Sequence, residues 1–300
     1  MTMFFDALAQ TVGADNVLKN EPMSSHTTFR IGGPADYYVT PGSPDEVIKI
    51  LDLCKKSDMP FYIVGNGSNL LVKDEGFRGL IIEMGSRFST VSINEYRVTA
   101  GAGAKLGQVA KTAMENGLAG MEFAHGIPGT VGGAVVMNAG AYGGEIKDII
   151  VEATVLDDDG NIYVLSKEAL ELGYRQSIIS KKNYIVLEAV FELLPDDPAW
   201  IKGRMDELAS KRREKQPLEY PSAGSTFKRP LNGFAAKLIE DSGLKGYSVG
   251  GAQVSEKHSG FVINKGGATA EDVLKLIDHI RDTVERDSGI RLETEVKIVG

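Results

Sequence analysis

The chain has 300 residues, of which 42% are hydrophobic and 25% charged, a composition that predicts a globular protein with two or three domains. The net charge of −8 argues against nucleic acid as a partner. The single Cys54 and four scattered histidines predict neither a disulfide nor a metal site. No apolar run approaches the roughly 20 residues that span a bilayer, and the first ten residues lack a basic leader, so we expect a cytoplasmic protein.

The first half of the chain predicts a helix, a strand and then a glycine loop. Ser43, Pro44 and Glu46 are typical of a helix start with a capping box, and residues 61–64 (FYIV) read as a buried strand. The loop GNGSNLL follows at 65–71. Further elements are expected as strands at 80–83 and 97–99, a helix at 105–116, and then a glycine-rich stretch at 126–144.

The second half predicts a hairpin, a long polar helix and a separate C-terminal region. The expected elements are strands at 149–156 and 162–165 joined by DDDG, a strand at 184–193, helices at 234–241 and after Thr269 and Asp272, and strands at 260–264 and 291–299. The proline-bounded start of the polar helix indicates a domain boundary near residue 200.

The two glycine segments, 65–71 and 126–144, favour a phosphate-bearing ligand. Successive N–H groups in glycine turns can form a nest for anions, although tight turns alone would also explain the glycines. The Gly-Lys-Ser/Thr ending of a P-loop is absent, and 65–70 and 101–107 have leucine where the Rossmann pattern needs its third glycine. We therefore expect a dinucleotide-like ligand that is held without the Rossmann fingerprint.

Several polar residues stand in unusual surroundings. Arg175 lies in GYRQSI and Ser225 in PSAGSTFKRP. In the last predicted strand, Glu293 and Glu295 share one face with Arg291. Each also has a structural reading: a surface arginine, a turn serine and an exposed acidic pair. Ser225 has no G-x-S-x-G elbow around it, which disfavours a hydrolase nucleophile. The most basic stretch contains Lys211, Arg212, Arg213 and Lys215, and a solvated helix end would explain it equally well.

Several long motifs, taken in chain order, resemble one family. They are HTTFRIGGPADYYV, GNGSNLL, GIPGTVGGAVVMNAGAYGGEI, YRQS, AGSTFKRP, GAQVSEKHSGFVIN and LETEV. Together they resemble the UDP-N-acetylenolpyruvoylglucosamine reductases (MurB family), in the shorter subclass that lacks a tyrosine loop over the substrate.

The resemblance implies an α+β fold with an FAD-binding region of the vanillyl-alcohol-oxidase (PCMH) type and a C-terminal substrate domain. The implied domains are FAD-binding subdomains at 1–85 and 86–200 and a substrate domain at 201–288; the final strand, 289–300, could return to the first subdomain. The residues implied to bind FAD are Gly65, Asn66, Gly67, Ser68, Asn69, Leu70, Gly126, Ile127, Pro128, Gly129, Thr130, Gly132, Gly133, Asn138, Ala139 and Gly140.

The implied activity is the NADPH-dependent reduction of UDP-N-acetylglucosamine enolpyruvate to UDP-N-acetylmuramate, a cytoplasmic step of peptidoglycan synthesis that also serves cell shape and division. Hydride would pass from flavin N5 to C3, and Ser225 would give a proton to C2. Hydride addition creates an enediolate, whose charge Arg175 and Glu295 would stabilise. Removing such stabilisation typically costs about 100- to 1,000-fold in rate.

The UDP diphosphate is expected to contact Lys215, Lys228 and Arg229, although Arg229 stands where some relatives carry asparagine. The resemblance implies no metal, and we expect a monomer.

Two other functions remain open from the sequence. A different FAD-dependent oxidase or dehydrogenase of the same fold would keep the glycine loops without needing Arg175, Ser225 and Glu295. A non-catalytic nucleotide-binding protein would use the loops as a sensor.

Overall fold

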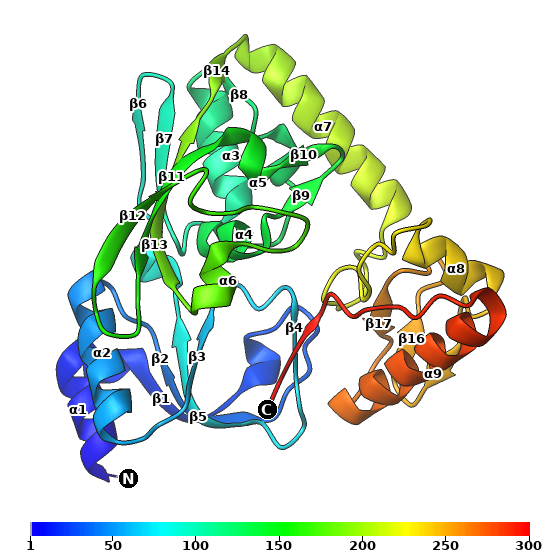
Figure 1. The fold of residues 1–300 in the computed structure, drawn as a ribbon, viewed down its shortest axis with the longest axis horizontal. Helices are drawn as coiled ribbons and strands as arrows, with labels where there is room; N and C mark the ends of the chain where they lie inside the picture. The colour runs from blue at the N-terminus through cyan, green and yellow to red at the C-terminus, as the bar shows by residue number, and fades with distance from the viewer. Residues whose placement is uncertain (1) are drawn as a thin grey trace. The chain divides into compact units, whose positions relative to one another are not determined.

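The computed structural model describes residues 2–300, which form two compact units (Figure 1). The first unit contains the N-terminal residues through Lys19, Tyr37–Asn66 and Gly79–Arg212; the second contains Asn20–Asp36, Gly67–Arg78 and Arg213–Gly300. The expected boundary near residue 200 is close to the start of helix α7 (Pro198–Lys215), whereas the two units divide inside this helix. The three-domain division stays a prediction.

The predicted helix after Ser43 is confirmed. It is α2 (Pro44–Lys56), and the Ser43 hydroxyl accepts a hydrogen bond from the Glu46 N–H at 3.2 Å. Helix α1 (Thr2–Val12) packs against it. The cap satisfies one of the free N–H groups at the helix start, which explains why the sequence located this end so well.

Strands of the N-terminal region form a four-stranded sheet in the order β1-β2-β5-β3. The strands are β1 (Val17–Pro22), β2 (Pro34–Val39), β5 (Phe77–Glu83) and β3 (Phe61–Val64). The predicted strand at 61–64 is confirmed, but it is not buried, because β3 is an edge strand: Phe61 is 37% exposed, and only Val64 is buried.

The core of the first unit is built around a five-stranded antiparallel sheet with the order β12-β11-β13-β7-β6. Its strands are β6 (Val91–Asn94), β7 (Arg97–Gly101), β11 (Ile150–Leu156), β12 (Ile162–Ser166) and β13 (Ile185–Glu192). The predicted hairpin and the strand after it are confirmed as β11, β12 and β13, and the predicted helix at 105–116 as α3 (Leu106–Glu115).

The glycine-rich stretch contains a helix that the sequence did not predict. This helix, α4 (Val131–Met137), packs against β13 and β7 (Figure 1). Gly132 and Gly133 lower helix propensity, so no periodic pattern marks α4. Its burial against the sheet compensates for the unfavourable propensity.

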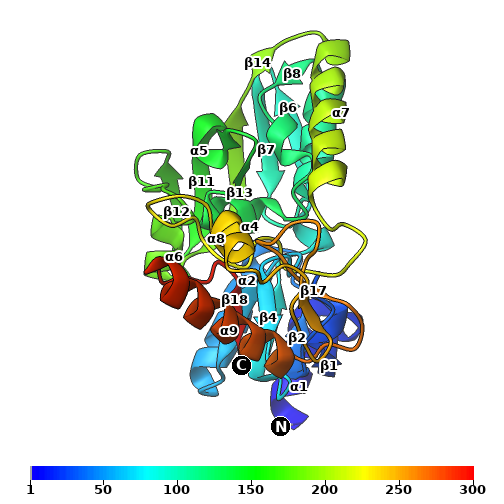
Figure 2. The same ribbon diagram turned by 90° about the vertical axis from the view of Figure 1, so that its right-hand side faces the viewer.

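Short elements complete the first unit. They are β8 (Leu118–Ala119) paired with β14 (Leu194–Pro195), β9 (Gly140–Ala141) paired with β10 (Gly144–Glu145), α5 (Ile146–Ile149) and α6 (Ile178–Lys182). Helix α7 begins next to β14 and is long and straight (Figure 2). None of the helices within residues 2–300 is both long enough and apolar enough to cross a membrane.

The second unit has its own core between a small sheet and two helices. The antiparallel sheet has the order β15-β16-β17, with β15 (Ser248–Val249), β16 (Ala252–Val254) and β17 (Val262–Asn264). Helix α9 (Ala270–Ser288) packs against β15, β16 and α8 (Ala235–Asp241). The predicted capping box at Thr269 and Asp272 is confirmed: each side chain accepts a hydrogen bond from the other residue's N–H.

The predicted last strand is shorter than expected. The regular strand β18 covers only Lys297–Val299 and pairs in parallel with β4 (Leu70–Val72), whereas Thr294 makes a single bridge to Phe227. Leu292 and Val296 are both buried in the second unit, whereas Arg291 and Glu293 are exposed. Leu292 and Val296 therefore define the buried side of the segment that leads into β18.

Candidate functional site

The two predicted glycine loops meet inside the first unit. The Asn66 side-chain amide donates to the Pro128 carbonyl at 2.7 Å. A Cβ at residue 65 would lie 2.2 Å from the Thr130 hydroxyl, so this contact requires glycine at 65. The sequence placed both loops at one ligand, and Gly65, Asn66, Pro128 and Thr130 do lie together.

Thr130 gives a test of whether this place fits a polar cofactor. The residue is only 5% exposed, and its hydroxyl is one of two buried side-chain oxygens in the described part of the chain that have no hydrogen-bond partner. An unsatisfied buried hydroxyl costs about 1–3 kcal/mol, so such groups normally have an explanation. The Thr130 hydroxyl can both donate and accept a hydrogen bond, and it lies where the two glycine loops meet. Such a group fits the polar, phosphate-bearing FAD that the sequence implies.

Some backbone donors of the second loop are already used inside the protein. The N–H groups of Ile127, Val131 and Gly132 donate to the carbonyls of Ala124, Ala104 and Ala102, at 3.0, 2.9 and 2.8 Å. They cannot donate to a cofactor at the same time. The expected N–H nest over 126–133 is therefore smaller than the glycine count suggests.

Gly65→Ala is expected to weaken FAD binding. Overpacking of this kind costs about 1–3 kcal/mol, so the Kd for FAD should rise by about tenfold or more. The measurement is flavin absorbance per protein together with a titration of the apoprotein with FAD. Gly203→Ala is the control, because this glycine of α7 has nothing within 4 Å of its missing Cβ. Full FAD affinity in Gly65→Ala would contradict the assignment.

The rest of the first loop belongs to the second unit and is tied to the predicted catalytic region. Gly67 has φ 59°, and a Cβ there would lie 2.0 Å from the His26 carbonyl oxygen. The Asn69 side chain donates to the Glu295 carbonyl at 3.2 Å, and the Asn69 carbonyl accepts from the Lys297 N–H at 2.9 Å. The end of the GNGSN loop is thus fixed directly to Glu295 and to Lys297, the first residue of β18.

Ser225 and Glu295 are brought together by backbone pairing. The Glu295 N–H donates to the Thr226 carbonyl at 2.9 Å, and Phe227 forms an antiparallel bridge with Thr294. On the other side, the Thr226 N–H donates to the Gly260 carbonyl at 2.8 Å. Ser225 therefore stands next to the residue that pairs with Glu295, on a segment held from both sides.

The predicted diphosphate contacts are also in the second unit. Lys228 pairs with Glu293 through the backbone at 2.8 Å and through its ammonium at 3.1 Å. The Arg229 guanidinium lies 4.2 Å from the centre of the Phe234 ring, and Lys215 is the last residue of α7. Lys228 thus belongs to the same segment as Ser225, which pairs with residues 293–295, and Arg229 follows it directly.

Arg175 lies in the first unit, in a tight turn formed by residues 173–176. Gly173 and Gln176 exchange two backbone hydrogen bonds, at 3.1 and 3.3 Å. Arg175 itself has φ 55°, a left-handed conformation that normally favours glycine or asparagine in such a turn. This conformation costs a non-glycine residue about 1–2 kcal/mol. Retaining arginine there at a cost to stability favours a functional role for its guanidinium.

The basic stretch divides into residues with different surroundings. Lys211 forms an ion pair with Glu207 on the exposed surface of α7. Arg212 instead lies against the second glycine loop, with its Cδ 3.2 Å from the place that a Cβ would take at Gly126, and burial lowers the pKa of its guanidinium. The difference between Lys211 and Arg212 arises from packing, so it could not be predicted from their neighbouring positions in the sequence.

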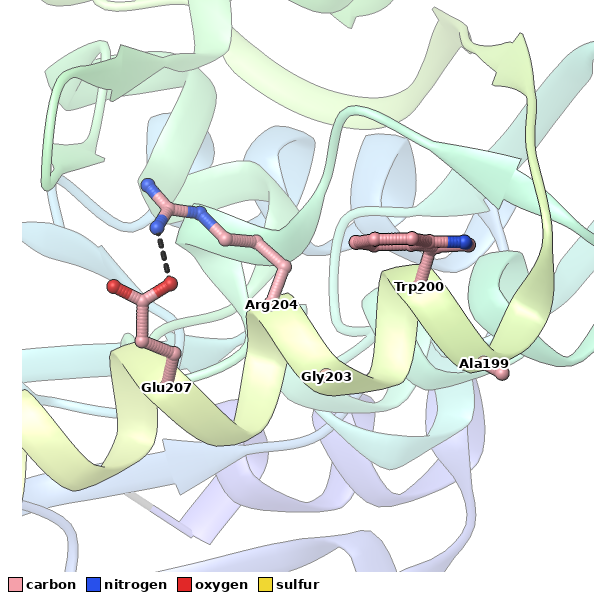
Figure 3. A pocket seen from close by; sticks show the side chains of 5 residues that line it. All are labelled: Ala199, Trp200, Gly203, Arg204 and Glu207. Carbon is pink, nitrogen blue, oxygen red and sulfur yellow. Dashed lines mark hydrogen bonds and ion pairs between the residues drawn. The ribbon is translucent and has the colours of Figure 1, made fainter.

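A hollow on α7 is lined by Ala199, Trp200, Gly203, Arg204 and Glu207 (Figure 3). The Trp200 ring is exposed along the helix, and Arg204 forms an ion pair with Glu207. All five residues come from a single helix and include none of the predicted site residues. The hollow is therefore separate from the candidate site described above.

Comparisons with known proteins agree with this arrangement. A family model described as an FAD binding domain matches residues 35–166, and one described as the C-terminal domain of UDP-N-acetylenolpyruvoylglucosamine reductase matches residues 216–299. UDP-N-acetylenolpyruvoylglucosamine reductases of Agathobacter rectalis and Clostridium perfringens are 54% and 53% identical to the chain; the alignments cover 99% of it and 98% and 97% of those proteins. The crystal structure of the same reductase from Thermus caldophilus is similar, with a TM-score of 0.81 and 34% identity over 95% of this chain and 98% of that one.

The fold and the paired glycine loops define an FAD-containing oxidoreductase with an α+β fold, whose cofactor region is of the vanillyl-alcohol-oxidase (PCMH) type. The fold class, the FAD cofactor and the enzymatic nature expected from the sequence are confirmed. Within this class, the chain belongs to the UDP-N-acetylenolpyruvoylglucosamine reductase (MurB) family, as the motifs predicted.

Proposed function

We propose that the chain reduces the enolpyruvyl group of UDP-N-acetylglucosamine enolpyruvate with NADPH, and that Arg175, Ser225 and Glu295 act on that group. The single observation that carries the proposal is a continuous set of hydrogen bonds in the second unit. It runs from Asn69 of the cofactor loop to the Glu295 carbonyl, and from the Glu295 N–H to Thr226 beside Ser225. A cofactor loop fixed to the segments of the proposed proton donor and of a charge-stabilising residue is what a combined hydride and proton transfer requires.

FAD, which the loops around Gly65, Asn66 and Thr130 would hold, would supply the redox chemistry that carries hydride from NADPH to C3 of the enolpyruvyl ether. The protein must then stabilise negative charge, because electrons move into the substrate carboxylate and form an enediolate. The fork-shaped guanidinium of Arg175 matches a carboxylate in two places, and charge-assisted pairs of this kind are strong. Glu295, when protonated, would donate a hydrogen bond to the same carboxylate.

Ser225 completes the reaction by giving a proton to C2. A serine hydroxyl is a weak acid, but the enediolate is a strong base, so transfer from a well-placed hydroxyl is favourable. Thr226 is hydrogen-bonded to Gly260 on one side and to Glu295 on the other, which fixes the backbone of the donor. The hydroxyl of Ser259, next to Gly260, is buried without a partner among the described residues and offers a further polar contact near this segment.

Lys215, Lys228 and Arg229 are proposed to bind the UDP diphosphate, which needs several cations. Lys228 already forms an ion pair with Glu293, so the substrate diphosphate would replace the Glu293 carboxylate as the partner of this lysine. The product is a precursor of peptidoglycan, and we infer a cytoplasmic, monomeric enzyme.

An anaerobic visible spectrum tests the proposed function. NADPH is expected to bleach the flavin band of the purified protein, and UDP-N-acetylglucosamine enolpyruvate is expected to restore it. Bleaching that only oxygen reverses would favour another oxidase or dehydrogenase of the same fold. A protein without flavin absorbance after reconstitution with FAD would favour the non-catalytic nucleotide-binding alternative.

A further inference from the structure

We propose that Asn138 is a positioning residue for Arg175 and does not bind the cofactor through its side chain. The inference rests on the proposed function of Arg175. The sequence placed Asn138 among the FAD contacts because it belongs to the NAGAYG stretch. The structure instead buries Asn138 completely and directs its amide into the protein.

The Asn138 side-chain amide makes three hydrogen bonds within the protein. Its amide nitrogen donates to the Gly173 carbonyl at 3.0 Å and to a Glu145 carboxylate oxygen at 2.9 Å. Its amide oxygen accepts from the Lys147 N–H at 2.9 Å. Both N–H donors of the amide are therefore used within the protein, and the side chain has no N–H left to donate to FAD.

The bond to Gly173 acts directly on the turn that carries Arg175. Gly173 is the first residue of that turn, and its carbonyl also accepts the Gln176 N–H that closes it. Because Arg175 holds a left-handed conformation at some cost, the turn needs external support. The Asn138 amide supplies this support from the end of α4.

A second bond reinforces the same connection. Ser177, which is fully buried, donates its hydroxyl hydrogen to the Val136 carbonyl at 2.7 Å. Two hydrogen bonds therefore fix the 173–176 turn to the end of α4. The Asn138 bond to Gly173 lies before Arg175 in the chain, and the Ser177 bond to Val136 lies after it. The tip of the turn bears Tyr174, which is exposed, and Arg175, which is half-buried.

The same amide also fixes a carboxylate near Arg175. The Lys147 ammonium lies 2.8 Å from a Glu145 carboxylate oxygen. Its hydrogen bond, the single hydrogen bond from Asn138 and the charge of Arg175 together hold the pKa of the Glu145 carboxyl below its usual range. Glu145 is thus an anion whose field acts on the guanidinium. Asn138 joins the backbone of the turn and this anion in one network, and so sets both the place and the electrostatic surroundings of Arg175.

Asn138→Gly is the principal test. Asn138 ends α4 with φ 42°, a conformation in which glycine is the usual residue, so the backbone should be retained while the amide is lost. We expect unchanged FAD content and unchanged flavin reduction by NADPH. Reoxidation by the enolpyruvyl substrate should slow by about 10- to 100-fold, because small misplacements of a catalytic group have effects of this size.

Asn138→Asp is the second variant and replaces the two donated bonds by repulsion. It keeps an oxygen for the Lys147 N–H but puts a buried carboxylate against Glu145 and the Gly173 carbonyl, so it should be slowed at least as much as Asn138→Gly. Asn183→Gly is the matched control, since Asn183 ends α6 with φ 54° and is exposed. Trypsin cleavage after Arg175, followed by mass spectrometry, gives a readout independent of turnover and should be faster in both Asn138 variants only.

A double-mutant cycle separates the possible outcomes. If Asn138 acts through Arg175, Asn138→Gly should cause no further slowing in an Arg175→Ala background. Equal slowing in both backgrounds would overturn the inference, as would full activity in Asn138→Asp. An Arg175→Ala enzyme with normal reoxidation would instead overturn the proposed role of Arg175, which distinguishes the two failures.

Discussion

Ser225→Ala is expected to slow the reaction of reduced enzyme with the enolpyruvyl substrate by about 100- to 10,000-fold, the range usual for loss of a positioned proton donor. Reduction of FAD by NADPH should remain nearly normal, because Ser225 takes part only in protonation at C2. Stopped-flow absorbance at the flavin band measures the two half-reactions separately.

The fold should tolerate this substitution. The Ser225 segment is held by backbone hydrogen bonds from Thr226 to Gly260 and from Glu295 to Thr226, none of which uses the serine hydroxyl. Ser222→Ala is the matched control, because Ser222 lies in the same loop and bridges to Ile263 through its backbone. Equal slowing of both half-reactions in Ser225→Ala would exclude Ser225 as the specific proton donor.

Glu295→Ala is expected to lower the rate of the same half-reaction by about 100- to 1,000-fold, since it removes a group that stabilises charge as the enediolate forms. Glu295→Gln keeps a hydrogen-bond donor, so it should retain more activity than alanine if Glu295 acts in its protonated form. Single-turnover rates across a pH series, together with substrate affinity, are the measurements.

Glu293→Gln is the control for Glu295. Its side chain is exposed, and it lies two positions away on the same segment, where it pairs with Lys228. We expect the single-turnover rate at saturating substrate to be unchanged in this variant. A loss in Glu293→Gln as large as that in Glu295→Ala would show that the segment matters only for its structure.

Local chemistry explains which elements could be predicted from the sequence. Ser43 and Thr269 identified their helices because their caps involve residues within three positions along the chain. The helix α4 and the shortened strand β18 could not be predicted, because α4 depends on burial against β13 and β18 on its pairing with β4. These contacts join segments that are remote in sequence.

The candidate site shows the same limit. Gly65 and Thr130 were both selected as FAD contacts, and the structure brings them together, but the closeness of Arg212 to Gly126 was not foreseen. Asn138 was selected for its motif, and only the structure shows that its amide contacts Gly173 and Glu145. A sequence indicates which residues are unusual more readily than which atom each one touches.

The link between the cofactor loop and the last strand also has a consequence for how the enzyme is made. Asn69 and Glu295 are separated by 226 residues, and loop closure over such a distance carries a large entropic cost. Native contacts of this range tend to form late in folding and slow it. We therefore expect the loop that carries Asn69 to reach its final place late in folding, so that stable FAD binding would report on complete folding.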